Sequence, residues 1–476
     1  MQFNSLEYAV LLGVCFVAYW ATVRRPVLPT IVLLAASYLF YGSWNRWYLL
    51  LIFVSSTVDF LAVRQMVGCR TRAGRKRWLT LSLVYNLGTL AVFKYFNFFI
   101  DSARDAGHAF GLALDLPTLH LLLPAGISFF TFQSMSYAID VYREEIEPEP
   151  SYLRYLTFVS FFPQLVAGPI VRAKDLLPAM RARPPLDTNL ASQGLFLILV
   201  GLTKKIALAD PLALNLVDRT FDLPWQFSSV EVLFGVYGYA FQIYCDFSAY
   251  SDIAIGSALL FGFHFPANFD APYRSLDLQE FWRRWHISLS SWLRDYLYVP
   301  LGGNRGSALA TYRNLMLTML LGGLWHGASW NFVVWGLLHG GALAVLRFVQ
   351  RRRTAAGQGP LLGAHPLGRL AAGVLTFHFV CLAWVFFRAR TFEDAWAVLD
   401  RIVAFEWGTT NLGGLVLGTL LVALVTHLCP RSLFDAVSRR FMALPAWAQA
   451  LVLVAGLQGL GQLAGTEVVP FIYFQF

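Results

Sequence analysis

Charged residues are scarce in this 476-residue sequence. Asp, Glu, Lys and Arg make up 14% of the chain, and the mean hydropathy is +0.54, whereas about a quarter of the residues of a soluble domain are charged. Hydrophobic residues make up 57%. This shortage of charge excludes an ordinary soluble globular protein and indicates an integral membrane protein with several spans.

Acidic residues are scarcer than basic ones, with 28 against 37, so the net charge is +9. A basic chain can bind nucleic acid, but these Lys and Arg residues form short clusters between apolar runs, as the positive-inside rule expects of cytoplasmic loops. The richest cluster comprises Arg64, Arg70, Arg72, Arg75, Lys76 and Arg77. The expected partner is therefore membrane lipid, and no nucleic acid is expected.

Cysteine motifs are missing as well. No CxxC pair occurs among the five scattered cysteines, which are Cys15, Cys69, Cys245, Cys381 and Cys429. The sequence therefore predicts neither a disulfide framework nor a metal site.

The apolar runs predict an all-α polytopic membrane protein. Residues 1–22 lack the basic start and cleavage motif of a secretory signal, which predicts a retained first span with the N-terminus outside. Further spans are expected at 28–41, 47–63, 78–100, 121–141, 194–217, 230–263, 315–346, 370–387, 412–428 and 447–464. This gives about eleven spanning helices, plus re-entrant or interfacial ones. The C-terminus is also expected outside, which requires an even number of full crossings, so at least one of these segments is expected to be miscounted or to cross only partly.

The longest uncharged stretch lies between Arg313 and Arg347 and is centred on His326. As one helix it would be about 50 Å long, which exceeds a hydrocarbon core of about 30 Å. Glycines at 322, 323 and 327 flank the histidine, so a break is expected there. An ionisable residue at this depth is expensive, which favours a functional role over a helix-packing one. His339 lies on another side of a continuous helix and is interpreted as structural.

Two other regions carry unusual features. Residues 155–171 are short, apolar and interrupted by Pro163, Gly168 and Pro169, which predicts a broken or re-entrant element. Residues 279–304 predict one amphipathic helix at the membrane interface, with His286 and several arginines on a stripe that faces a polar cavity or solvent. Arg283, Arg284 and Arg294 could bind phosphate groups or simply anchor this helix.

Charged residues also occur inside apolar runs. Lys204, Lys205 and Asp210 are interpreted as a snorkelling helix end, with a transport pathway as the alternative. Asp246 and Asp252 do not share a helix face and are expected to hydrogen-bond within an irregular stretch of backbone.

Several motifs together resemble the membrane-bound O-acyltransferase family. The main pair is FWRRWHISLSSWLRDYLYVPLGGN around His286 and LGGLWHGASWNFVVWG around His326. Further matching stretches are FKYFNFF, FFPQLVAGPIVRA, GLTKKIALAD, CDFSAYSDIAIG, FPANFDAPY, WVFFRARTFEDA and the terminal FIYFQF. The resemblance covers nearly the whole chain, so residues 1–476 are expected to form a single domain. Among subfamilies, the chain is most similar to the bacterial alginate O-acetyltransferase type.

The resemblance implies tilted helices around a central funnel and tunnel. His326 and His286 are the expected catalytic residues, with His326 as the base and His286 towards the cytoplasmic donor side. Trp325, Asn331 and Arg294 are implied to lie near the substrates. A neutral imidazole can take a proton from a hydroxyl that attacks a carbonyl, and it needs no metal for this.

The expected function is transfer of an acetyl group from cytosolic acetyl-CoA, across the bacterial inner membrane, to an exopolysaccharide hydroxyl or to a periplasmic partner that relays it. The alternatives are O-acetylation of peptidoglycan or cellulose, and transfer of D-alanine or another acyl group from a cytosolic carrier protein. A transporter or flippase is the alternative outside the enzymes, because embedded charges and broken helices also mark transport pathways.

Overall fold

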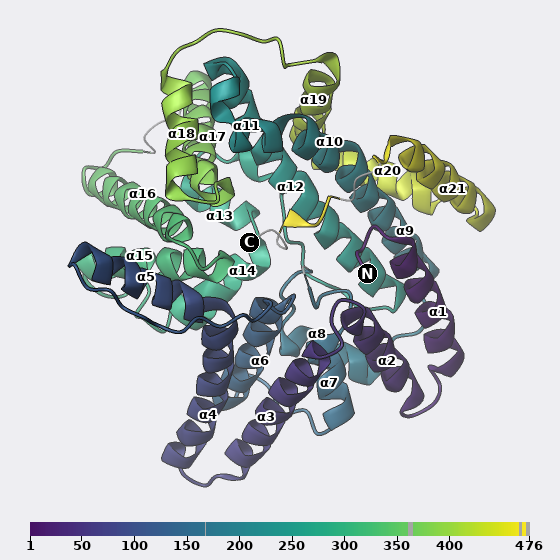
Figure 1. Cartoon of the computed structure of the whole chain (residues 1–476). Coiled ribbons are helices and arrows are strands. Elements are labelled where there is room, and N and C mark those ends of the chain that lie inside the picture. The colour runs from purple at the N-terminus through teal and green to yellow at the C-terminus, as the bar shows by residue number, and fades with distance from the viewer. Residues whose placement is uncertain (167, 360–364, 466–468, 473–476) are drawn as a thin grey trace. The chain divides into compact units, whose positions relative to one another are not determined.

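The computed structural model describes residues 1–166, 168–359, 365–465 and 469–472 (Figure 1). The chain forms two compact units. The first comprises Met1–Ile198 and Ile253–Pro266, and the second comprises Leu199–Asp252 and Ala267–Phe476. Both units consist of helices joined by loops, as the composition predicts.

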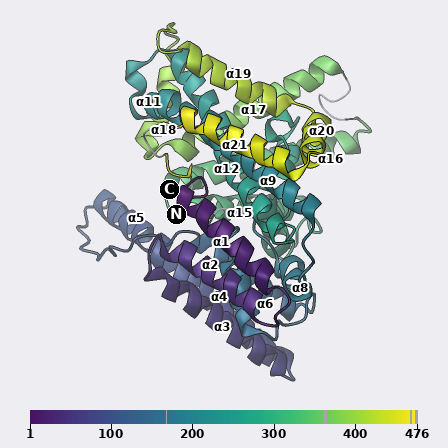
Figure 2. The same ribbon diagram turned by 90° about the vertical axis from the view of Figure 1, so that its right-hand side faces the viewer.

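The first unit contains a series of paired helices. Neighbouring helices α1 and α2 pack together, as do α3 and α4, while α6 packs on α4 and α7 packs on α2 (Figures 1 and 2). Their bounds are α1 Leu6–Thr22, α2 Leu28–Gly42, α3 Tyr48–Gly68, α4 Arg72–Leu90, α5 Phe96–Ala109, α6 Ile127–Tyr142, α7 Tyr152–Ser160 and α8 Ala173–Ala182. These ranges follow the apolar runs of the sequence closely.

The broken element predicted at 155–171 is confirmed. Helix α7 is short, and the described residues between it and α8, 161–166 and 168–172, are largely buried and irregular. Side chains satisfy part of this buried backbone: Ser37 accepts a hydrogen bond from the Phe162 amide at 3.1 Å, and the Gln164 amide donates to the Phe158 carbonyl at 2.7 Å. Irregular backbone is therefore buried inside protein here, as an apolar surrounding requires.

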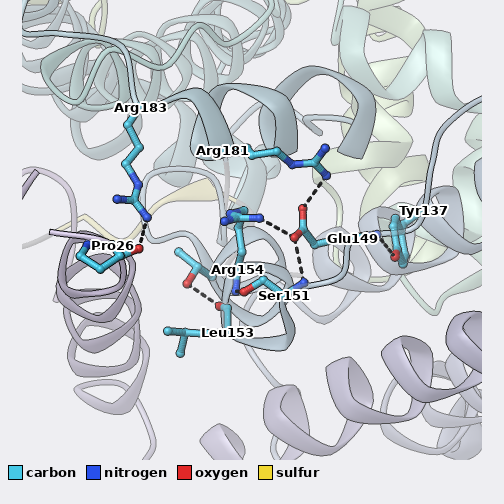
Figure 3. Close-up of polar contacts among 9 residues, drawn as sticks. Pro26, Tyr137, Glu149, Ser151, Leu153, Arg154, Arg181 and Arg183 are labelled. Atoms are coloured by element: carbon cyan, nitrogen blue, oxygen red, sulfur yellow. Dashed lines mark hydrogen bonds and ion pairs between the residues drawn. The ribbon is translucent and has the colours of Figure 1, made fainter. Parts of the chain in front are cut away.

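A buried carboxylate holds the loops between these helices. The Glu149 side chain is fully buried and pairs with Arg154 at 2.5 Å and with Arg181 at 3.1 Å (Figure 3). Its second role is local, since it accepts the Ser151 amide at 2.9 Å before α7 begins. One acidic side chain thus joins the α6–α7 loop to α7 and α8.

The second unit holds the remaining long helices. Two of them cross from one unit's residue range into the other's: α9 Thr188–Thr203 and α12 Ser229–Leu260. The other helices of at least seven residues are α13 Leu278–Arg284, α14 Ile287–Leu293, α15 Ala308–His326, α16 Trp330–Ala355, α17 Pro366–Arg388, α18 Phe392–Val403, α19 Gly414–Leu428, α20 Arg431–Met442 and α21 Ala446–Leu463. Short turns of helix lie between α9 and α12, namely η2 Lys204–Ala209, α10 Asp210–Leu212, η3 Ala213–Val217, α11 Asp218–Asp222 and η4 Pro224–Gln226.

The break expected in the central run is confirmed, but it lies after His326. Helix α15 ends at His326, Gly327 is extended, and α16 begins at Trp330. Gly323 remains helical and has a packing role, because a Cβ atom there would collide with the Phe332 carbonyl. A Cβ atom at Gly336 would lie 2.6 Å from the Met319 carbonyl oxygen. Glycines therefore let α15 and α16 pack backbone against backbone.

Within the described residues, five helices are long and apolar enough to cross a membrane. They are Tyr48–Gly68, Arg72–Ala109, Trp330–Ala355, Pro366–Arg388 and Ala446–Leu463. The pair α19 and α20, bent by 92° at its break, would make a sixth span (Figure 2), and α1 and α2 are shorter apolar helices. The chain is thus a multi-pass membrane protein, whereas eleven spans remain a prediction.

Candidate active site

The single amphipathic helix predicted over 279–304 is wrong. The segment is divided into α13, α14 and the π-helical turn η6 Arg294–Tyr298, with a break at Trp285–His286. His286 has a positive φ of 42°, which no helix accommodates. The two predicted stripes therefore do not continue across the break.

Asn268 explains where α14 begins. The Ile287 amide donates to the Asn268 carbonyl at 2.9 Å, and the Ser288 hydroxyl donates to Asn268 Oδ1 at 2.9 Å. Asn268 in turn donates to the Ser251 hydroxyl of α12 at 3.1 Å. Sequence reasoning did not single out Asn268, although it lies in the FPANFDAPY motif. This buried residue fixes the backbone directly after His286.

His286 is fully buried, contrary to the prediction that it faces a polar cavity or solvent. Its ring lies edge-on to Phe247 at 4.6 Å between centroids, and 5.8 Å from Trp325. The ring of His326 is 6.3 Å away. The structure therefore brings together the two histidines that the sequence separates by 40 residues.

His326 lies at the C-terminal end of α15 in an aromatic surrounding. It is buried, and its ring centroid is 5.0 Å from Trp325, 5.2 Å from Trp335 and 5.1 Å from Phe387. Trp335 and Phe387 were not anticipated from the sequence. The spacing of Asn331, Trp335 and His339 at intervals of four is the signal that one face of α16 lines this site.

The end of the described chain supports the His286 side of the site. Phe471 stacks on Tyr250 at 3.8 Å and lies 5.8 Å from Phe247, the ring that touches His286. The Ile472 amide donates to the Asp246 carboxylate at 2.7 Å. Most of the terminal FIYFQF motif, residues 473–476, lies outside the described residues.

The embedded charges form ion pairs, which corrects both sequence interpretations of them. Lys205 is buried and lies 2.8 Å from Asp210 and from Asp246, so it does not snorkel. Lys204 pairs with Asp252 at 2.7 Å. Asp246 and Asp252 belong to the regular helix α12 and not to irregular backbone. Their partners are side chains 41 and 48 residues earlier, which no local pattern indicates.

The other predicted site residues occupy different surroundings. Arg284 pairs with Glu280 at 2.8 Å and Asp270 at 3.2 Å, while Arg294 pairs with Asp295 at 2.7 Å and is largely exposed. Arg283 is exposed. Of the three arginines predicted to bind phosphate, Arg284 and Arg294 therefore already have carboxylate partners.

Asn331 and Trp325 are both buried. The Asn331 amide donates to the carbonyls of Ala389 and Thr391, each at 2.9 Å, and so joins the start of α16 to the α17–α18 connection. Trp325 contacts both histidine rings. Substrate contacts by either residue remain a prediction.

Comparison with known proteins matches this sequence to acyltransferases. Residues 129–385 match the membrane-bound O-acyltransferase family. A probable alginate O-acetylase of Pseudomonas aeruginosa is 43% identical over 402 residues, covering 83% of this chain and 74% of that protein. A peptidoglycan O-acetyltransferase of Helicobacter pylori is 38% identical, covering 85% and 80%. A teichoic acid D-alanyltransferase of Streptococcus thermophilus is 30% identical, covering 59% and 71%.

Proposed function

The chain belongs to the membrane-bound O-acyltransferase family, and we propose that it moves an acetyl group from cytosolic acetyl-CoA to a hydroxyl across the membrane. The acceptor is an exopolysaccharide of the alginate type or a periplasmic partner that relays the group. The observation that carries this proposal is the pairing of two buried imidazoles, His326 and His286, in one aromatic site. The names of the alginate and peptidoglycan relatives support acetyl as the transferred group.

In this mechanism His326 is the general base. Its neutral imidazole takes the proton of the acceptor hydroxyl while the hydroxyl oxygen bonds to the thioester carbonyl carbon. The carbon–sulfur bond then breaks, and the imidazolium returns the proton to the leaving thiolate. The products are an ester and a free thiol, so the step needs no further reactant.

We assign His286 to positioning the acyl donor beside this base. Its ring lies next to His326 and is held from behind by Phe247. Trp325, which contacts both imidazoles, would fix the angle between them. Proximity of this kind lowers a barrier because the reacting groups need not be ordered during the reaction.

The proposed location is the bacterial inner membrane, with both termini outside. The basic loops, above all 64–77, then face the cytoplasm and the acyl donor. Among the described residues, no segment between helices is long enough to hold a glycan, which is why a separate acceptor or relay protein is proposed as partner.

The test is acetylation of the cell-surface polymer, measured by mass spectrometry of the released glycans. His326→Ala should lower transfer by about 10²- to 10⁴-fold, the usual contribution of a general base, at unchanged protein abundance. His378→Ala is the matched control, because His378 is exposed on α17 and bonds Tyr237 at 2.8 Å. Acetylation at the wild-type level in His326→Ala would remove His326 from the mechanism.

A second candidate is transfer of D-alanine or another acyl group from a carrier-protein thioester, which the relative named teichoic acid D-alanyltransferase favours. The same mass spectra distinguish it, because the added mass identifies the acyl group. A transporter would instead leave purified protein unable to release CoA from acetyl-CoA.

A further inference from the structure

A groove in the second unit is lined by α12, α17, α19 and the turn η5 Pro272–Arg274. Its volume is about 700 Å³, which falls in the range of small-molecule sites. Phe241 of α12 and Ala423 of α19 belong to one buried cluster, while η5 packs on α17. The walls of the groove are therefore held by packing on their neighbours.

The walls are apolar and open to the outside. Phe234 and Phe241 of α12 and Phe377 of α17 line the groove. Six further apolar side chains in its walls are exposed, namely Leu370, Val374, Leu417, Leu421, Leu424 and Leu428. Helix α17 is long and apolar enough to cross a membrane, and α19 belongs to the bent pair that would make a further span. A hydrocarbon chain suits a groove between two such helices, because an empty groove forfeits van der Waals contacts on both walls.

The bend between α19 and α20 indicates which end of the groove lies near the membrane surface. Helix α19 ends at Leu428, which lines the groove, and α20 continues at an angle of 92° (Figure 2). Helix α20 exposes Leu433 and Val437 as well as Arg439 and Arg440. This combination is typical of a helix that lies in the interface. The end of the groove at Leu428 is therefore expected at the level of the lipid headgroups.

Two guanidinium groups lie at the same end. Arg274 and Arg369 both line the groove, and Arg369 belongs to the first turn of α17. The Tyr273 amide donates to His427 Nε2 at 3.1 Å, which places the neighbouring Arg274 beside the end of α19. Neither arginine pairs with a carboxylate in the part of the chain that the structure describes. Two cations without an acidic partner beside an apolar groove favour an anionic headgroup.

His427 adds a third polar group to this end of the groove. It is buried, and it lines the wall. Because its Nε2 accepts the Tyr273 amide, Nδ1 carries the proton of the neutral ring. No hydrogen-bond partner for Nδ1 occurs among the described residues. An unsatisfied buried donor is costly, and a phosphate or ester oxygen of a lipid would satisfy it.

We propose that this groove binds one anionic phospholipid, with an acyl chain between α17 and α19, its phosphate at Arg274 and Arg369, and an oxygen atom at His427. This inference goes beyond the proposed acyl transfer, because the lipid is neither donor nor acceptor. Its role is to complete the contacts between two helices. A ligand that binds only the folded state stabilises it by mass action, so the lipid should raise the unfolding temperature.

The experiment titrates two lipids into the full-length protein in detergent and follows binding by native mass spectrometry. Phosphatidylglycerol and phosphatidylcholine can carry the same acyl chains, but only the first has a net negative charge. Wild-type protein should bind one phosphatidylglycerol, and phosphatidylcholine about tenfold more weakly. The double variant Arg274→Gln/Arg369→Gln should weaken phosphatidylglycerol by about tenfold or more and leave phosphatidylcholine unchanged.

The matched control removes two cations elsewhere. Arg352 and Arg440 are exposed and do not line the groove. The double variant Arg352→Gln/Arg440→Gln should therefore bind phosphatidylglycerol as wild type does. Equal losses in the two double variants would show a general attraction of anionic lipid to a basic surface, which overturns the site.

A second variant fills the groove. Gly373 of α17 lines it, and a Cβ atom there would lie 3.7 Å from the Leu276 side chain and 4.0 Å from the Ser275 carbonyl oxygen, which are ordinary contact distances. Leucine is also a better helix former than glycine. Gly373→Leu should therefore unfold no earlier than wild type without lipid, yet it should lose binding of both lipids. The control is Gly459→Leu on α21, where a Cβ atom meets open space.

Three other outcomes overturn the proposal. Unchanged lipid binding in Gly373→Leu would show that the acyl chain lies elsewhere. Inorganic phosphate that raises the unfolding temperature of wild type as much as phosphatidylglycerol would make the ligand a soluble anion. Wild-type protein that neither retains phosphatidylglycerol nor gains stability from it would show that the groove holds only exchanging bulk lipid. All of these measurements are independent of acetyl transfer, so they do not test the proposed function.

Discussion

Each compact unit buries a triad of charges, and the two triads have opposite signs at the centre. In the first unit a carboxylate, Glu149, lies between Arg154 and Arg181 (Figure 3). In the second unit an ammonium group, Lys205, lies between Asp210 and Asp246. The two triads also differ in how far their outer members are exposed to solvent. The Arg181 side chain is 49% exposed, whereas that of Asp246 is only 3% exposed.

This difference indicates different uses of buried charge. The Glu149 triad joins loops and an adjacent helix pair, and water can solvate part of it if one member is lost. The Lys205 triad connects to the Ile472 amide through Asp246, and the neighbouring Phe471 lies against the rings behind His286. We therefore expect the first triad to matter for stability alone and the second for stability and catalysis together.

The largest effect is expected from Lys205→Met. It leaves the carboxylates of Asp210 and Asp246 close together, the latter almost fully buried, and breaking a buried pair in this way costs about 3–5 kcal/mol. Thermal unfolding in detergent should show the lower stability, and acetyl transfer per folded molecule should also fall. Adding Asp246→Asn to this variant removes one stranded charge and should restore part of the stability. If it restores none, the stranded charge is not the cause.

An intermediate effect is expected from Glu149→Gln. The neutral amide leaves Arg154 and Arg181 without a counterion, but the exposed part of Arg181 can turn to solvent, so the loss should be about 1–3 kcal/mol. Transfer per folded molecule, measured beside the unfolding midpoint, should equal that of wild type. A fall in specific activity as large as that of Lys205→Met would contradict the proposed difference between the triads.

The smallest effect separates the two arginines of the first unit. Arg181→Gln removes a half-exposed partner and should change stability by no more than about 1 kcal/mol. Arg154→Gln removes the more buried partner, with 17% of its side chain exposed, and should cost more. The unfolding midpoints of the two variants give the order, and the reverse order would show that exposure does not set the contribution here.

The helices of the fold follow from local sequence, because an apolar run in a membrane must be helical and its length is set by the bilayer. Residues 28–41 and 370–387 therefore nearly match α2 and α17. The division of 279–304 does not follow in the same way. It depends on Asn268, which lies outside the segment and supplies hydrogen bonds that the helical period does not reveal.

The candidate site was predictable in part for the same reason. His326 could be found from its depth and its glycines, and His286 from its motif. Their aromatic walls come from Phe247, Trp335 and Phe387, which belong to three separate helices. A period within one helix shows which face is apolar but not which other helix that face meets. The ion pairs of Lys205 could not be predicted for the same reason, because their partners are distant in the sequence.

The close packing of α15 on α16 limits how far these two helices can move relative to each other. Gly323 and Gly336 leave no space between the two backbones, so neither helix can slide along the other without collision. His326 lies at the turn of this closely packed hairpin, so we expect the hairpin to hold its backbone in place. If His326 is the base, as proposed, we expect the donor and the acceptor to move to it and away from it while the hairpin stays in place.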